Sequence, residues 1–406
     1  ATFDSGEQVF HPEPGELYFY MNTAATHGRP LIDFDEMPTS TSQVVVGDAG
    51  TREVIAYSQL PAELRGAVHT TVLSPDGRYV YIVGPGTNTG GPVLTGSSEL
   101  RVSATLLKVD ALSLRPIKQL SVGGRLHHGQ VFQDRYLLMD TFTSDPDGLD
   151  VFLFDPETDE IIGGVSNADL GGRNYTSYTD DEYIYILMNP AGDDPRRFAA
   201  GSSTVMRPFW VTKLDPETWE VVAEYPYSGY RGDWIIIDSN SESMYIPAAV
   251  SDNVTKVNLV TGAIEWAAST GIGPYGGTLN ADESQIWVAN KGETSGFLGR
   301  TITVVDTATG RLVDTLYSGY MADHVLLSPD GTEMWVTSNG EGSIYVFDAT
   351  TREQRDVIPM PHRGEPHGTV WVTYDEDGEG RVVRDQGGFH NGVHPARGNP
   401  LVLTEN

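Results

Sequence analysis

The chain has 406 residues, 45 of them glycine and 24 proline, and a formal net charge of -30. This acidity argues against nucleic acid as a partner, because binding a polyanion depends on clustered Lys and Arg. The absence of cysteine excludes disulfides, zinc-thiolate sites and haem attachment through cysteine, so any metal must be held by nitrogen and oxygen ligands.

Apolar segments of strand length follow one another along the chain, separated by turns rich in Gly, Asp, Asn and Pro. The clearest unit, residues 69–83, is an apolar strand, a Ser-Pro-Asp-Gly turn and a second, alternating strand; residues 324–336 repeat it almost residue for residue. Aligned on this turn, the inner strands of seven units begin at His69, His128, Tyr175, Trp234, Gly276, His324 and His367. Most units continue with a third strand, a turn and a fourth strand. This repetition predicts an all-β, seven-bladed β-propeller.

The two chain ends are expected to complete one blade. The last unit lacks outer strands after Val382 and Val383, which are expected in its second strand, whereas residues 44–57 have the pattern of a third and a fourth strand before the first unit. We therefore predict a single domain over residues 1–406, with an N-terminal arm (1–40) and a C-terminal loop (387–406) packed on it. The pattern leaves open whether residues 17–20 join the same blade.

The inner hairpins resemble the surface-layer (YVTN-like) type of seven-bladed propeller repeat. Their Ser-Pro-Asp-Gly turns are followed by Tyr-Val-Tyr or Met-Trp-Val, and the likeness extends over about residues 42 to 385. It implies the fold and says little about function, since propellers host many unrelated activities.

Four of the seven equivalent positions are histidine: His69, His128, His324 and His367. The first strands of all blades line the central channel in the same direction, so we expect these residues on one ring near its mouth, where His127 adds a fifth imidazole. They come from consecutive blades. A packing role copied with the repeat is the alternative, but the other positions have diverged to Tyr175, Trp234 and Gly276, which are expected to mark an open side of the ring.

Converging neutral imidazoles without thiolates suit copper, zinc, iron or nickel better than calcium or magnesium. His390 and His394, just past the last strand, are two further candidate ligands if that loop returns to the channel mouth. As part of a C-terminal loop they are equally candidates for plain solvent exposure.

The histidine pattern resembles the copper-cluster propellers of nitrous oxide reductase and thiocyanate dehydrogenase. The matching residues are His69, the His127–His128 pair, His324 and His367. The resemblance implies a copper cofactor, redox chemistry and a carboxylate ligand, for which Asp233 is the natural candidate. Two departures are clear: without cysteine the binuclear copper domain of nitrous oxide reductase is absent, and the third to fifth blades lack a complete histidine set.

Four neighbours of the ring are candidate catalytic residues. Tyr175 and Tyr275 are placed to hydrogen-bond a substrate or donate a proton, with channel-filling aromatics as the alternative. Asp323 directly precedes His324 and Asp233 is its repeat partner, so each is a candidate ligand, orienter of an imidazole or general base. Arginines shortly before the ring positions, such as Arg125 and Arg231, are candidates for attracting an anion.

The sequence therefore predicts a copper-dependent oxidoreductase acting on a small-molecule substrate, with a sulfur- or nitrogen-containing anion as one candidate class. Electrons would pass to an external acceptor, because no second redox centre is apparent. The alternatives are a binding or scaffold propeller with a structural metal, and a zinc- or iron-dependent lyase or hydrolase. No apolar stretch is long enough for a membrane span. A start at Ala1 suits an exported, periplasmic or secreted protein whose signal peptide has been removed. The oligomeric state stays open.

Overall fold

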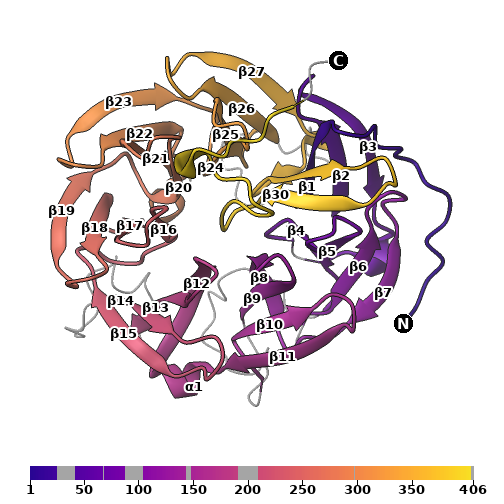
Figure 1. Ribbon diagram of the computed structural model, residues 1–406, viewed down its shortest axis with the longest axis horizontal. Helices are drawn as coiled ribbons and strands as arrows, with labels where there is room; N and C mark the ends of the chain where they lie inside the picture. The colour runs from indigo at the N-terminus through magenta and orange to yellow at the C-terminus, as the bar shows by residue number, and fades with distance from the viewer. Residues whose placement is uncertain are drawn as a thin grey trace.

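The predicted architecture is confirmed. A computed structural model describes residues 1–24, 42–66, 68–86, 104–142, 148–190, 209–296 and 298–403. These residues form seven antiparallel sheets in a closed ring around a central channel (Figure 1), with a single short α-helix, α1 (Asn167–Leu170), in the described part. Residues 25–40 of the expected N-terminal arm and residues 404–406 lie outside the described residues.

Six blades are four-stranded and follow the chain from the channel outward. Blade 1 comprises β4 (Val72–Leu73), β5 (Tyr79–Val83), β6 (Leu106–Asp110) and β7 (Pro116–Leu120). Blade 2 comprises β8 (Arg125–Phe132), β9 (Tyr136–Phe142), β10 (Val151–Asp155) and β11 (Glu160–Val165). Blade 3 comprises β12 (Gly172–Thr179), β13 (Ile184–Pro190), β14 (Trp210–Leu214) and β15 (Val221–Pro226). Blade 4 comprises β16 (Ile236–Ile237), β17 (Ser243–Ala248), β18 (Asn253–Asn258) and β19 (Ile264–Ser269). Blade 5 comprises β20 (Pro274–Leu279), β21 (Gln285–Asn290), β22 (Thr301–Asp306) and β23 (Leu312–Tyr317). Blade 6 comprises β24 (Ala322–Leu327), β25 (Glu333–Ser338), β26 (Ser343–Asp348) and β27 (Gln354–Pro359). The short 3-10 helices are η2 (Ala62–Leu64), η3 (Glu293–Ser295), η4 (Pro361–Arg363) and η5 (Pro395–Arg397).

The seventh blade combines both chain ends, as predicted. Its order is β3 (Glu53–Gln59), β2 (Gln43–Asp48), β1 (Leu17–Ala24), β29 (Val370–Tyr374) and β30 (Gly380–Arg384), and the short β28 (Glu365–Pro366) also pairs with β1. The strand left open by the sequence pattern, β1, thus occupies the second-strand position between β2 and β29.

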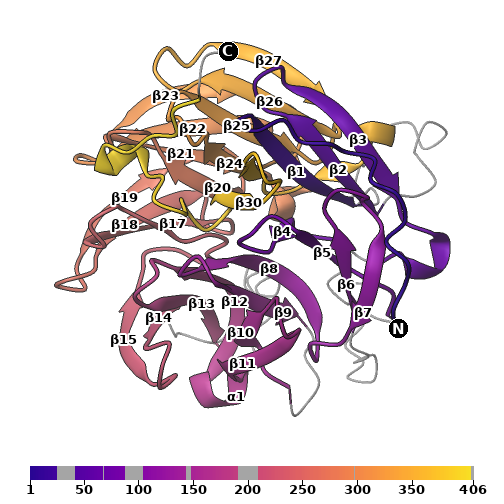
Figure 2. The same ribbon diagram turned by 45° about the vertical axis from the view of Figure 1, so that its right-hand side comes forward.

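The position of β30 differs from the expectation that Val382 and Val383 form the second strand of the blade. Because β1 already occupies the outer edge of β29, β30 pairs with its other edge and lies toward the channel. Figures 1 and 2 both show β30 and the following segment near the centre of the ring, beside β4 and β24.

Burial along the strands follows from this arrangement. The inner strand β8 and the closing strand β1 are buried at every residue, whereas the outer strand β3 alternates between exposed and half-buried residues. Inner strands are covered by neighbouring blades on both faces, while an outer strand keeps one face in water. The core therefore lies between the blades, where large side chains such as Trp335 and Trp371 pack edge to face at 5.3 Å.

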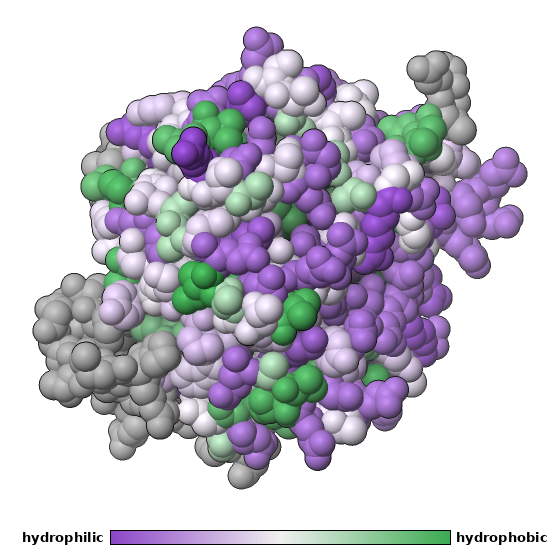
Figure 3. Space-filling model, turned by 60° about the vertical axis from the view of Figure 1, so that its left-hand side comes forward, coloured by the Kyte–Doolittle hydropathy of each residue, from purple (hydrophilic) through white to green (hydrophobic). Residues whose placement is uncertain are grey.

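The outer surface is mostly hydrophilic. On the face seen in Figure 3, hydrophobic residues form small separate groups among polar ones. Within the described part of the chain, no helix combines the length and the apolar character needed to cross a membrane.

Candidate metal centre

A β-bulge marks the start of four inner strands. The pairing register shifts by one residue between Leu126 and His128 in β8, and at the equivalent places in β12, β20 and β24. A bulge sets two residues of one strand opposite a single residue of its partner. Two successive side chains, such as His127 and His128, therefore both reach the site.

The strand pairing corrects the predicted alignment of the third blade by one residue. Tyr175 is equivalent to His127, Tyr275 and Asp323, while Thr176 occupies the position of His128 and His324. The bulge is common to these strands, so the offset comes from aligning them by their apolar residues instead of by their pairing partners.

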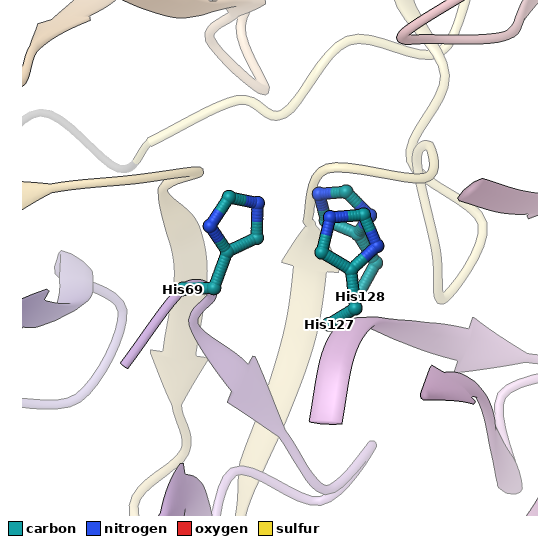
Figure 4. A group of neighbouring side chains, drawn as sticks. All are labelled: His69, His127 and His128. Atoms are coloured by element: carbon teal, nitrogen blue, oxygen red, sulfur yellow. The ribbon is translucent and has the colours of Figure 1, made fainter. Parts of the chain in front are cut away.

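Three histidines lie within reach of one metal ion. One ring nitrogen from each of His69, His127 and His128 lies within 4.8 Å of the others. The His69 ring stacks on His127 with centroids 4.5 Å apart, and the His127 and His128 centroids are 3.8 Å apart. Figure 4 shows the three rings side by side, His69 from the segment before β4 and the pair from β8.

Hydrogen bonds at Nδ1 orient the histidine pair. Nδ1 of His127 contacts the Tyr175 carbonyl oxygen at 2.7 Å and Asp140 Oδ1 at 3.1 Å, and Nδ1 of His128 lies 2.7 Å from Thr176 Oγ1. A carbonyl oxygen can only accept, so Nδ1 of His127 carries the proton and Nε2 has a free lone pair. Both Nε2 atoms are buried and have no hydrogen-bond partner among the described residues. Such an anchored imidazole with a free Nε2 is the usual state of a metal-ligating histidine.

The ring continues on the other side with His324 and His367. Nδ1 of His367 lies 2.9 Å from Asp323 Oδ2, and both ring nitrogens of buried His324 have no hydrogen-bond partner. The His69 ring lies 4.8 Å from that of His367, and the His128 ring lies 5.9 Å from that of His324. The structure thus brings all five predicted ring histidines together.

Four of the ring imidazoles are held neutral. Burial lowers the pKa of His69, His127 and His128 well below the ordinary value, with neighbouring histidines adding to the effect at His69 and His128 and Arg125 adding to it at His127. Burial also lowers the pKa of His324 to about 4. Neutral imidazole is the form that binds a metal, so the site needs no deprotonation at neutral pH.

These depressed pKa values predict an acid-labile metal-free protein. The unfolded state takes up protons on these histidines below about pH 6.5 while the folded state does not, so stability falls as pH falls. For His324 alone, with a folded pKa of about 4, we expect a loss of about 1.4 kcal/mol between pH 7.5 and 5.5. Urea unfolding with a chelator present measures the free energy of unfolding at each pH. The His324→Gln variant should lack the part of the pH dependence that comes from His324. Equal pH dependence in the two proteins would contradict this account.

Asp323 orients the ring. Burial raises its pKa, but Lys291, whose Nζ lies 2.8 Å from Oδ1, and the two histidines outweigh burial and hold the pKa well below the ordinary value. Asp323 therefore stays ionised at neutral pH. Of the three roles the sequence leaves open, its contact with Nδ1 of His367 matches the orienter of an imidazole.

The predicted tyrosines and Asp233 form a connected polar group beside the histidines. Tyr275 OH lies 3.0 Å from His69 Nε2 and 3.3 Å from Tyr175 OH, which accepts a hydrogen bond of 3.1 Å from Arg231 Nη2. Arg231 Nη2 also lies 3.3 Å from Asp233 Oδ1 and 3.1 Å from Glu293 Oε1. Burial raises the pKa of Asp233 to about 7, so this carboxyl can hold or release a proton near neutral pH.

The side of the ring expected to be open is filled. The Trp234 ring lies 4.9 Å from His128 and 4.7 Å from His324. At Gly276, a Cβ atom would come within 2.8 Å of the Asp323 carbonyl oxygen and 2.9 Å of the His324 Cα. This glycine permits the close approach of β24, so its lack of a side chain leaves no opening.

His390 and His394 lie away from the ring. Both line a pocket at the C-terminal ends of the inner strands, whereas the ring lies at their N-terminal ends. In this pocket, Nε2 of His390 lies 2.8 Å from Asp385 Oδ1. The reason is the inward position of β30, from which the chain continues along the far end of the channel.

Four functional neighbours were missed in the sequence: Asp140, Thr176, Lys291 and Glu293. Asp140 Oδ1 accepts the His128 backbone N–H at 3.1 Å, and its Oδ2 accepts the N–H and the hydroxyl of Ser177. A carboxylate at the end of the otherwise apolar segment Leu137-Leu-Met-Asp140 is the one signal that could have revealed it.

Comparisons with known proteins support the fold. Neither a protein-family model nor a curated protein sequence matches this chain. Among solved structures it is similar to the dihydro-heme d1 dehydrogenase NirN in complex with DHE, at 18% identity over 89% of this chain and 76% of that chain, with a TM-score of 0.53. A putative 6-phosphogluconolactonase from Bacteroides fragilis shares 11% identity over 88% of this chain and 98% of that chain, with a TM-score of 0.58. A Desulfotomaculum acetoxidans protein of unknown function shares 12% identity over 86% and 97%, with a TM-score of 0.56. At these identities the likeness shows the propeller fold alone.

Proposed function

We propose that this propeller is a copper-dependent oxidoreductase that oxidises a small anion at the histidine ring. The observation that supports it most is the group of three imidazoles with ligand nitrogens within 4.8 Å, two of which present buried Nε2 atoms without partners. Buried polar atoms almost always have a partner, and a metal ion supplies one to several converging imidazoles at once.

The donor set fits copper. The ligand candidates among the described residues are imidazole nitrogens, which copper, zinc and iron all accept. The carboxylates of Asp233 and Asp323 lie beside them as proton acceptor and orienter. His69, His127 and His128 would hold one ion, and His324 and His367 are placed to hold another. The resemblance to copper-cluster propellers favours copper over the others. When bound, copper would supply the electron-transfer chemistry.

The remaining residues of the site would bind the substrate and handle protons. Buried Arg125 provides positive charge near the ring in an otherwise acidic protein. Arg231 and Lys291 are paired with carboxylates. Burial, with further contributions from nearby carboxylates, raises the pKa of Tyr175 and of Tyr275 well above the ordinary value, so both hydroxyls stay protonated and can donate hydrogen bonds. Asp233, with a pKa of about 7, is the best candidate to accept a proton released on oxidation. Electrons would leave to an external acceptor, and a periplasmic or secreted location is part of this proposal.

One solved neighbour belongs to the same broad reaction class. The structure of a dihydro-heme d1 dehydrogenase is similar in fold to this chain. That protein is a dehydrogenase with a similar fold, which is compatible with the reaction class of this proposal and says nothing of the substrate.

Elemental analysis of untagged protein, followed by an activity assay, tests the proposal. We expect about two or three copper ions per chain, a copper EPR signal, and oxidation of thiocyanate coupled to reduction of ferricyanide as the external acceptor. Asp233→Asn should lower turnover and leave the copper content unchanged.

Other metal contents would reject the proposal in a defined way. A single zinc with hydrolytic or lyase activity would support the zinc enzyme instead, and one redox-silent ion without turnover would support a scaffold role. A folded protein that takes up no metal at all would exclude each of these metal-dependent functions.

A further inference from the structure

A second group of buried polar side chains lies at the end of the channel opposite the histidine ring. The inner strands all run in the same direction, so the ring lies at their starts and a pocket lies at their ends. The pocket is lined by the ends of β12, β16, β20 and β24 and by the chain that follows β30. Neither the proposed metal nor its substrate involves this end.

Arg384 contributes an unpaired positive charge to the pocket. Its side chain is buried, with a relative exposure of 5%, and it donates to two neutral oxygens: Nη2 to Thr278 Oγ1 at 3.1 Å and Nε to the Leu327 carbonyl at 3.3 Å. Burial lowers the pKa of Arg384 to about 10, so it stays charged at neutral pH. Its guanidinium carbon lies 4.3 Å from the centre of the Phe389 ring, and the charge of Asp385 stabilises it only through space, without an ion pair among the described residues. A buried charge that lacks a direct counter-ion gains from a ligand that supplies one.

The adjacent carboxylate is committed elsewhere. Asp385 Oδ1 accepts from the Gly387 backbone N–H at 2.9 Å and lies 2.8 Å from His390 Nε2, and its Oδ2 accepts from the Val131 backbone N–H at 2.7 Å. These contacts hold the C-terminal segment across the channel and explain why Asp385 does not pair with Arg384.

Two imidazoles of the pocket also have an unused nitrogen. His390 is buried, with a relative exposure of 5%, and its Nδ1 has no hydrogen-bond partner; Nδ1 of His394 is likewise buried without one. Both residues line the pocket with Arg384. These two nitrogens have almost no accessible surface, so the Arg384 guanidinium is the group of the pocket that a bound acceptor would reach.

The rest of the lining provides apolar walls and limits the charge of the ligand. Trp234, Ile236, Leu279 and Phe389 supply aromatic and aliphatic walls. The carboxylates at the rim are acceptors in their own turns; Glu283 Oε1, for example, accepts from the Ser239 N–H at 2.7 Å. Their negative charge disfavours a multiply charged anion, so the pocket suits one carboxylate joined to an apolar group.

We propose that this pocket binds a small organic monocarboxylate, with its carboxylate on the Arg384 guanidinium and its apolar part against Trp234, Ile236 and Leu279. The planar guanidinium matches the geometry of a carboxylate. The proposal does not rest on the proposed function, although Trp234 of the pocket also packs against His128 and His324 of the ring.

Calorimetric titration of the full chain with benzoate tests the proposal, with benzamide as the neutral analogue of the same shape and sulfate as the divalent anion. We expect one saturable benzoate site and affinity for benzamide weaker by about tenfold or more, because hydrogen bonds to a charged group carry the difference. Sulfate should not compete. Arg384→Met should abolish binding, while His11→Ala, at an exposed residue outside both sites, should leave it unchanged.

Fold integrity is checked by circular dichroism. If Arg384→Met does not fold, Leu279→Phe, which narrows the pocket and retains the guanidinium, carries the test and should weaken benzoate binding by about tenfold or more through steric exclusion. The proposal is overturned if benzoate does not bind, if benzamide binds equally well, or if benzoate binding persists in the folded variants. Arg384 would then serve only to anchor the C-terminal segment.

Discussion

Replacing His128 with alanine is expected to lower the affinity for copper by more than about 100-fold, because loss of even an outer-shell partner of a ligand costs about 10- to 100-fold. His128 contributes one of three nitrogens within 4.8 Å, and its removal leaves a site of two imidazoles on that side of the ring. Competition with a chromophoric chelator measures the change. The matched control is His11→Ala, since His11 is exposed and lies outside the ring.

A companion variant separates ligation from orientation. Asp140→Asn keeps all five histidines but weakens the contacts of Asp140 with His127 Nδ1, the His128 N–H and Ser177. We expect a loss of about 10- to 100-fold in copper affinity, smaller than that of His128→Ala. Unchanged affinity in both variants would show that the histidine ring does not bind the metal.

Replacing Phe19 with alanine is expected to lower the free energy of unfolding by about 3 to 5 kcal/mol, the range for a large aromatic side chain removed from a packed core. Phe19 is fully buried in β1 and packs edge to face on Trp335 of blade 6 at 5.2 Å. It therefore joins the closing blade to its neighbour. Equilibrium unfolding in urea, monitored by tryptophan fluorescence, measures the change.

The control for Phe19 lies in the outermost strand of the same blade. Ile55 in β3 is 46% exposed, so Ile55→Ala should cost much less than Phe19→Ala. Similar losses for the two variants would mean that β1 does not carry the closure of the ring.

Most of the fold could be predicted from the sequence because each blade repeats the same local pattern. Polar turns between apolar strands, strands of alternating polarity and a second turn after the third strand are local features; two units share a Ser-Pro-Asp-Gly turn, and the looser pattern recurs around the ring. The equivalence of His69, His128, His324 and His367 followed from the same repeats, because equivalent strands in a closed ring bring equivalent residues to one height.

The details of the candidate site depended on contacts between blades. Asp140 and Lys291 lie on other strands than the imidazoles or the carboxylate that they contact, so no spacing along the chain reveals them. The pairing partners that bring Tyr175, rather than Asn174, level with His127 lie on β9 and β13, so the apolar pattern of β12 alone does not reveal them.

The sequence by itself thus determined the seven-bladed architecture, the closure by both chain ends and the five histidines of the ring, since these follow from repeated local patterns and from the symmetry of a closed ring. Only the tertiary structure decided that β1 takes the second-strand position, that β30 turns into the channel, and that His390 and His394 therefore lie at the end opposite the ring. The physical reason is that β1, and not β30, pairs with the outer edge of β29, which leaves the inner edge to β30. Pairing between segments hundreds of residues apart depends on packing in three dimensions, which no local pattern records.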